Sequence, residues 1–130
     1  MSDIPRYWLL PGDACFWVAE EAETGAVLGT VAARRGGPLD QHTPLAELQA
    51  CDTFSVFKLS TAREARGRGV ARQLMQAVEE FAAASGGSRV TLVTGAAGAK
   101  LFYARCGYTL TAGGARGTSI SEWTKELSKE

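Results

Sequence analysis

The sequence predicts an α/β (α+β) fold, because a β-strand, a glycine-rich turn and an amphipathic helix follow one another near its centre. Residues 53–60 are rich in apolar and β-prone side chains, as in a strand buried on both faces. Residues 70–84 carry apolar side chains near one helical face. They are Val70, Leu74, Met75, Val78, Phe81 and Ala82. The chain of 130 residues, 45% of them hydrophobic, is long enough to bury a core, and we expect residues 1–130 to form a single domain.

The residues before the central strand predict an arm, a hairpin and a long loop. Residues 1–14 are expected to form a short strand or an irregular arm. Residues 15–21 and 26–34 are two expected strands joined at Glu23-Thr24-Gly25, where glycine suits a hairpin turn. Residues 35–52 then form a long loop with one helical turn, started by Thr43 as N-cap and Pro44. Such a loop either borders a substrate site or is a disordered surface insert.

The residues after the central helix predict further alternation of strands and helices. Ser85-Gly86-Gly87 is a helix-ending signal, and Gly107 ends the next helix. The remaining expected elements are a strand at 89–94, a helix at 99–106, a strand beginning at 108–110 and a last strand at 118–125.

The turn before the central helix is a candidate anion site. Gly67 and Gly69 can adopt backbone angles that a Cβ atom forbids. They also let backbone N–H groups gather at a helix N-terminus, where the helix dipole favours negative charge. We interpret the turn as a pyrophosphate cradle; the alternative is a tight turn with solvated arginines. It is neither a Walker loop, which needs Gly-Lys-Ser/Thr, nor a dinucleotide fingerprint, which needs a third glycine.

Charge is balanced overall but uneven along the chain. The 14 basic and 14 acidic residues give a net charge of zero, which argues against a dominant nucleic-acid role. Four arginines nevertheless flank the glycine-rich turn, namely Arg63, Arg66, Arg68 and Arg72. Basic charge at a helix N-terminus opposes the dipole unless an anion is bound there. The cluster therefore favours a phosphorylated ligand over a merely exposed basic helix start, and a generic phosphate or nucleic-acid surface is a weaker third alternative.

Two motifs carry a family resemblance. Arg66-Gly67-Arg68-Gly69-Val70-Ala71 resembles the Arg/Gln-x-x-Gly-x-Gly/Ala acyl-CoA signature of the GCN5-related N-acetyltransferases (GNAT). Residues 99–108, with Phe102-Tyr103 and Gly107-Tyr108, resemble the A-x-x-F-Y-x-x-x-G-F/Y helix and turn of the same family. The motifs occur in the family's order with a predicted strand between them. The stretch from Cys15 to Thr111 is most similar to the camello-like branch of this family.

The resemblance implies a fold and a binding site for acetyl-CoA. The fold is a mixed, mostly antiparallel sheet with a central splayed parallel strand pair and flanking helices. The gap between the paired strands admits the pantetheine arm, whose amides bond the backbone of Leu59, Ser60 and Thr61. The signature residues bind the diphosphate, and they are Arg66, Gly67, Arg68, Gly69, Val70 and Ala71. The N-terminal helices that complete the acceptor wall in relatives are shortened or absent, so a homodimer partner is a candidate to complete it.

The implied reaction is direct attack of an amine on the thioester, with no metal. Tyr103 occupies the family position for the proton donor to the leaving thiolate; the alternative is a core aromatic residue beside Phe102. Glu64 and Asp52 are candidate general bases, and a water chain is another. Many relatives have an asparagine near the position of Ala96 that bonds the cofactor arm. Alanine cannot make this bond, so we expect Ala96 to weaken cofactor binding.

The cysteine and histidine content points to no further chemistry. Three cysteines, Cys15, Cys51 and Cys106, show no metal-ligand spacing and are expected as reduced thiols in a cytosol-like compartment. His42, the only histidine, lies in no partner motif for Cys106 as a nucleophile or for a Ser-His-Asp triad. Neither a signal peptide nor a membrane-spanning run is found, so we expect a cytoplasmic protein without a membrane partner. The camello-like relatives usually carry a hydrophobic anchor.

Two hypotheses follow. The first is an acetyl-CoA-dependent N-acetyltransferase acting on a small-molecule or peptide amine. The second is a non-catalytic acyl-CoA-binding or regulatory module on the same fold. The sequence leaves the acceptor open among small amines, amino-acid conjugates, peptide N-termini and lysine side chains.

Overall fold

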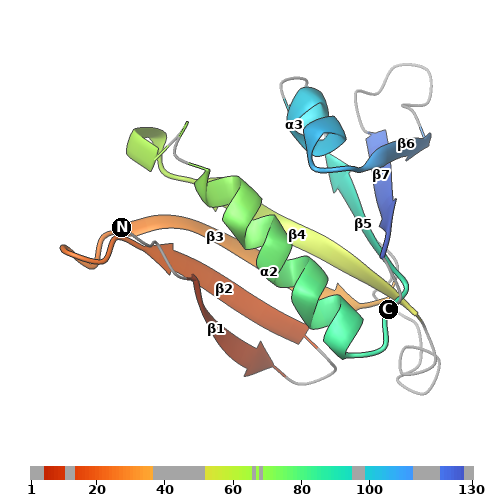
Figure 1. Ribbon diagram of the computed structural model, residues 1–130, viewed down its shortest axis with the longest axis horizontal. Helices are drawn as coiled ribbons and strands as arrows, with labels where there is room; N and C mark the ends of the chain where they lie inside the picture. The colour runs from red at the N-terminus through yellow and green to blue at the C-terminus, as the bar shows by residue number, and fades with distance from the viewer. Residues whose placement is uncertain are drawn as a thin grey trace.

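The computed structural model describes residues 5–10, 14–36, 52–65, 67, 69–94, 99–112 and 121–127. Seven strands in this part of the chain form one sheet in the order β1-β2-β3-β4-β5-β7-β6 (Figure 1). The strands are β1 (Pro5–Leu10), β2 (Ala14–Glu20), β3 (Val27–Arg35), β4 (Thr53–Thr61), β5 (Arg89–Thr94), β6 (Thr109–Ala112) and β7 (Ser121–Glu126). The described helices are η1 (Arg63–Ala65, a 3-10 turn), α2 (Val70–Ala84) and α3 (Ala99–Arg105).

The sheet confirms the expected fold class. All neighbouring strands are antiparallel except β4 and β5, which are parallel. The crossover between these two is α2, which lies across one face of the sheet (Figure 1). β1 ends at Leu10 and β2 begins at Ala14, so three residues separate these two antiparallel strands.

The parallel strands β4 and β5 pair along only part of their length. Their register runs from Thr53 opposite Arg89 to Val56 opposite Leu92. Beyond this point β4 continues to Thr61 without β5 as a neighbour. The two strands therefore separate toward their carboxyl ends, which confirms the expected splay.

An extra residue in β4 accompanies this separation. Thr30 of β3 pairs with Ser60 of β4, whereas Ala32 pairs with Phe57. One β3 residue between these pairs thus faces two residues of β4, Lys58 and Leu59. This is the geometry of a β-bulge, which bends the bulged strand and increases its twist.

The separation of β5 from β4 also corrects one expectation about the central strand. Phe54, Ser55 and Val56 are buried, as expected for a strand covered on both faces. Phe57, in contrast, is 39% exposed, and Ser60 is exposed as well. The expectation is wrong beyond Val56, because β5 no longer lies alongside β4 there.

The core lies between α2 and the sheet. Leu74 and Val78 of α2 are fully buried, and each buried side chain of this size stabilises the fold by about 1.5–3 kcal/mol. Phe81 contacts Trp17 and Phe54 edge-to-face, with ring centroids 5.4 and 5.6 Å apart. These contacts fix the helix on strands β2 and β4.

Glycine at position 29 permits a close approach of β3 to α2. A Cβ atom there would lie 2.9 Å from the Ser60 carbonyl oxygen and 3.0 Å from a methyl group of Leu74. Any other residue would push the helix or the end of β4 away. Gly29 thus helps to set the position of α2 over the splayed strands.

The predicted element boundaries agree closely with the structure in the described residues. The helix expected at 70–84 is α2, and the strand expected at 89–94 is β5. The last strand begins at Ser121, and residues 118–120 lie outside the described residues. Residues 37–51, which include Cys51, His42, Thr43 and Pro44 and for which the sequence predicts a loop with one helical turn, also lie outside them. No described helix is both long and apolar enough to cross a membrane.

Candidate active site

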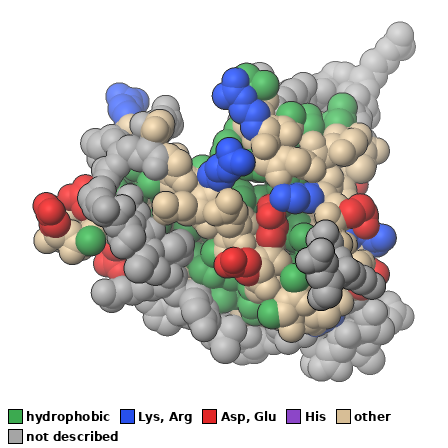
Figure 2. Space-filling model, in the orientation of Figure 1, with side chains coloured by type: hydrophobic (Ala, Val, Ile, Leu, Met, Phe, Trp, Pro, Cys, Tyr) green, Lys and Arg blue, Asp and Glu red, His purple; other side chains and the backbone are tan. Residues whose placement is uncertain are grey.

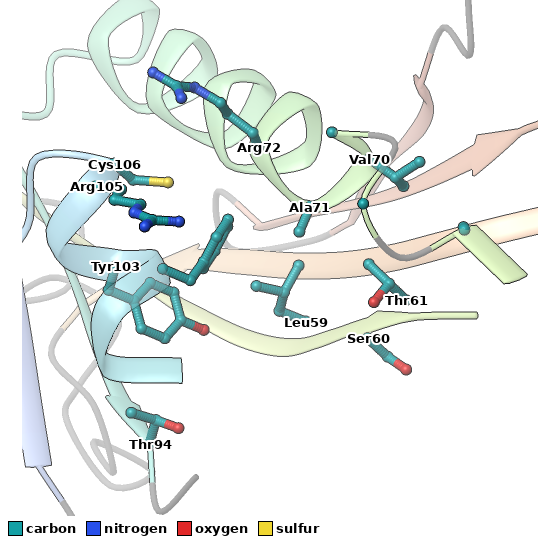
Figure 3. A pocket seen from close by; sticks show the side chains of 14 residues that line it. Leu59, Ser60, Thr61, Val70, Ala71, Arg72, Thr94, Tyr103, Arg105 and Cys106 are labelled. Carbon is teal, nitrogen blue, oxygen red and sulfur yellow. The ribbon is translucent and has the colours of Figure 1, made fainter. Parts of the chain in front are cut away.

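A cavity of about 770 Å³ opens beside the splayed end of β4, between the N-terminus of α2 and the helix α3 (Figure 3). Most of the residues that the sequence assigned to cofactor binding line this one cavity. They are Leu59, Ser60, Thr61, Gly67, Gly69, Val70 and Ala71. Tyr103, the candidate proton donor, lines it as well. Arg66 and Arg68 lie outside the described residues, as does Ala96.

The turn before α2 has the backbone conformation that its glycines make possible. Gly67 and Gly69 have φ angles of +84° and +77°, in the left-handed region that favours glycine. Gly69 is the N-cap residue and supplies no side-chain hydrogen bond to the helix. These two glycines allow the chain to turn sharply from β4 into the first turn of α2.

The first turn of α2 lines the cavity with backbone N–H groups that have no acceptor within the helix. The Gln73 N–H donates to the Gly69 carbonyl oxygen at 3.0 Å, which begins the helical pattern. The N–H groups of Val70 and Ala71 precede that bond and have no acceptor within the helix. No acidic side chain lies in the first turn to offset the positive end of the dipole. This end of α2 can therefore bind an anion.

Tyr103 points its hydroxyl group into the cavity from α3 (Figure 3). The residue is 7% exposed, and its ring packs against Phe102 and Tyr108 with centroids 5.2 and 6.0 Å away. Burial, and secondly the nearby Cys106, raises the pKa of the Tyr103 hydroxyl above its ordinary value. The hydroxyl is therefore protonated at neutral pH, and it has no hydrogen-bond partner in the described part of the chain. It is available to donate to a bound molecule.

A partly buried polar network holds α3 against α2 and β7. The Tyr108 hydroxyl donates to Glu79 at 3.0 Å, and the Lys125 ammonium donates to Glu79 and to the Cys106 carbonyl oxygen, each at 2.9 Å. The side chains of Glu79 and Lys125 are 15% and 30% exposed. Burial and the adjacent Glu79 carboxylate raise the pKa of Tyr108 far above its ordinary range. This network fixes the C-terminal end of the helix that carries Tyr103.

Sequence reasoning missed several residues of the cavity wall. The residues that it did not assign to the site are Ala65, Thr94, Phe102, Arg105 and Cys106, whereas Arg72, which also lines the cavity, belongs to the arginine cluster that the sequence indicated. Three of these, Phe102, Arg105 and Cys106, share a signal that was present in the sequence, because they lie near one face of a helix together with Tyr103. Once Tyr103 is placed at the cavity, its neighbours on that face follow.

The structure removes one of the candidate bases. Asp52 precedes β4, whereas the cavity lies at the opposite end of that strand, roughly 20 Å away at about 3.3 Å per residue. Its carboxylate accepts hydrogen bonds from Ser88 at 2.6 Å and Arg89 at 3.4 Å. The Ser88 hydrogen bond is the main cause that lowers the pKa of Asp52. Asp52 as the general base is therefore wrong, and the side chain of Glu64 lies outside the described residues.

Comparison with known proteins agrees with this geometry. The acetyltransferase (GNAT) domain family matches residues 12–110. N-acetyltransferase 8 of Mus musculus is 37% identical over 130 residues, covering 98% of this chain and 52% of the relative. N-acetyltransferase 8B of Homo sapiens is 42% identical over 94 residues, covering 72% of this chain and 37% of the relative. The chain thus spans about half or less of the length of these relatives.

Solved structures show the same fold. The crystal structure of nourseothricin acetyltransferase matches with a TM-score of 0.70 at 24% identity, over 98% of this chain and 74% of that one. N-acetylglutamate synthase from Neisseria gonorrhoeae, complexed with coenzyme A and N-acetyl-glutamate, matches with a TM-score of 0.65 at 15% identity, over 88% of this chain and 26% of that one. The named relatives agree with the similarity to the camello-like branch. The chain therefore belongs to the GNAT family of acetyltransferases.

Proposed function

We propose that this chain transfers an acetyl group from acetyl-CoA to a primary amine by direct attack on the thioester. The observation that carries the proposal is the convergence of three features on one cavity. These features are the amides at the start of α2 that have no acceptor within the helix, the end of β4 beyond its pairing with β5, and the hydroxyl of Tyr103. Support comes from relatives named as N-acetyltransferases and from a neighbour of the same fold that was crystallised with coenzyme A.

Acetyl-CoA would extend along the cavity from α2 toward α3. The diphosphate binds the amides at Val70 and Ala71, with Gly67 and Gly69 shaping the approach. By family resemblance, Arg66 and Arg68 belong to the same cradle. The pantetheine arm then takes the place of β5 beside β4, where the backbone of Leu59, Ser60 and Thr61 supplies hydrogen bonds to its amides.

The chemistry needs one proton donor and one proton acceptor. The amine nitrogen forms a bond to the thioester carbonyl carbon, and backbone N–H groups stabilise the oxyanion that develops. The carbon–sulfur bond then breaks, and Tyr103 gives its proton to the departing thiolate. The attacking nitrogen loses a proton to Glu64 or to a chain of water molecules. That proton restores the Tyr103 hydroxyl for the next turnover.

The test follows the release of free coenzyme A thiol from acetyl-CoA over a panel of amines. The panel contains small amines, amino acids, peptides with a free N-terminus and peptides with a lysine side chain. Tyr103→Phe should slow transfer roughly 10²- to 10⁴-fold, the usual contribution of a proton donor, without weakening acetyl-CoA binding. Tyr108→Phe is the control, since its hydroxyl bonds Glu79 and does not line the cavity. Equal turnover in wild type and Tyr103→Phe would remove Tyr103 from the mechanism.

A non-catalytic acyl-CoA-binding or regulatory module is the second candidate. The observation that favours it is that no acidic side chain lines the cavity in the described part of the chain, so no base is assigned. Coenzyme A binding without turnover of any amine would identify this function. The cytoplasmic location, the single domain and the homodimer remain predictions from the sequence. Sedimentation at several protein concentrations tests the homodimer.

A further inference from the structure

Two arginines from different helices stand at the border of the cavity. Arg72 lies in the first turn of α2, and Arg105 is the last residue of α3. Both side chains are exposed, and neither forms an ion pair or a hydrogen bond in the described part of the chain. Figure 2 shows Lys and Arg side chains on both sides of the hollow between α2 and α3, and Figure 3 shows the two guanidinium groups at the α3 side of the cavity.

The two arginines are close in space and have no carboxylate beside them among the described residues that line the cavity. Arg72 is close enough to Cys106, the neighbour of Arg105, to act on the pKa of that thiol. No Asp or Glu side chain is present among the residues that line the cavity in the described part of the chain. A cation in the first turn of a helix is also unfavourable, because it faces the positive end of the helix dipole. An anion bound between the two guanidinium groups would offset both costs.

Coenzyme A carries more negative charge than the amides of α2 account for. Its 5′-diphosphate suits those amides, and its pantetheine arm and thioester are uncharged. The 3′-phosphate remains, and it is attached to the same ribose as the diphosphate. With the diphosphate at Val70 and Ala71, the next residue of α2 that lines the cavity is Arg72, whose exposed guanidinium group is available to a phosphate on the adjoining ribose.

We propose that Arg72 and Arg105 form a subsite for the 3′-phosphate of coenzyme A. This inference rests on the proposed function, because it takes the diphosphate to lie at the start of α2. Guanidinium groups suit the task, since their planar donors bind phosphate oxygens in pairs. The subsite makes the chain selective for coenzyme A over nucleotides that carry only a diphosphate.

The test compares coenzyme A with 3′-dephospho-coenzyme A, which keeps the diphosphate and the pantetheine arm. Isothermal titration calorimetry of the wild-type chain should show roughly tenfold or more tighter binding of coenzyme A, the size expected from charge-assisted hydrogen bonds. The double variant Arg72→Gln/Arg105→Gln should lose this preference and bind both ligands as the wild type binds 3′-dephospho-coenzyme A. The preference should also shrink with rising salt, because exposed charges are screened.

Arg89→Gln is the matched control, since it removes one arginine charge at the start of β5, outside the cavity. It should keep the wild-type preference. Equal wild-type affinity for the two ligands would overturn the subsite while leaving coenzyme A binding intact. A preference that survives in the double variant, or that Arg89→Gln also removes, would overturn the assignment to these residues. No binding of either ligand by the wild type would overturn the proposed function and the subsite together.

Discussion

Loss of Lys125 should destabilise the fold more than loss of any exposed cation. Its ammonium donates two hydrogen bonds of 2.9 Å, one to Glu79 and one to the Cys106 carbonyl oxygen. In Lys125→Met, the Glu79 carboxylate, only 15% exposed, would retain the Tyr108 hydroxyl as its one described partner. Breaking a partly buried pair in this way costs about 2–4 kcal/mol. A loss of about 3 kcal/mol corresponds to a melting temperature lower by roughly 10 °C.

A double-mutant cycle isolates the contribution of the pair. Glu79→Gln removes the charge that Lys125→Met leaves unpaired, so the double variant should be more stable than the two single losses predict. We expect a coupling energy of about 1–2 kcal/mol, measured by urea unfolding followed by circular dichroism. Arg89 and Glu126 provide the comparison pair, with a 3.2 Å contact and side chains 41% and 69% exposed. That pair should couple by no more than about 0.5 kcal/mol, because solvent screens it.

Two results would refute this reasoning. Single losses at Glu79 and Lys125 that add to within about 0.5 kcal/mol would show that the charges do not act as a unit. A coupling no larger than that of the Arg89 pair would show that burial does not strengthen the contact. Either result would mean that α3 is held by its aromatic contacts and not by the polar network.

Three further predictions concern the glycines and the cavity thiol. Gly69→Val should weaken coenzyme A binding, because a branched residue is strained at the φ angle of +77°. Gly25→Val, at a φ angle of +74° in the hairpin, should lower stability and keep the affinity for coenzyme A. Equal calorimetric affinities for the two variants would contradict this prediction. Gly29→Ala should lower the free energy of unfolding, measured with urea, by about 1–3 kcal/mol, because its Cβ atom would approach the Ser60 carbonyl oxygen to 2.9 Å. Wild-type stability in this variant would show that the strands move apart enough to accept the methyl group. Burial raises the pKa of Cys106, so its alkylation by iodoacetamide should be slow at pH 7 and accelerate only above the pH typical of a free cysteine. Because Cys106 lines the cavity, coenzyme A should block the alkylation, which mass spectrometry follows. Rapid labelling at pH 7 would contradict this prediction.

Much of the fold could be predicted from periodicity and turn chemistry. The apolar spacing from Val70 to Ala82 identified α2, and the glycines after it marked its end, because these signals depend only on nearby residues. The parallel pairing and its splay came from resemblance. No local pattern in residues 53–61 reveals that Lys58 and Leu59 share one partner across the sheet, since register depends on β3.

The candidate site was partly predictable, because the two motifs that identify it are continuous stretches of the sequence. The signature residues Gly67, Gly69, Val70 and Ala71 line the cavity, as does Tyr103 of the second motif, whereas Arg66 and Arg68 lie outside the described residues. Asp52 failed as a base because its distance along β4 from the cavity depends on the direction of the strand. Arg105 was missed because its position depends on how α3 packs, and the Glu79 network that sets this packing joins residues far apart in the chain.

The single additional residue in β4 has a consequence for how this architecture tolerates change. Without it, the alternation of side chains along the strand would continue unbroken, and β4 could stay hydrogen-bonded to β5 to the end of both. Deleting one amino acid at Lys58 or Leu59 could thus close the opening between the strands while leaving every helix and every motif in place. Among descendants of such a domain, loss of the reaction could begin with a three-nucleotide deletion that no inspection of the signature residues would detect.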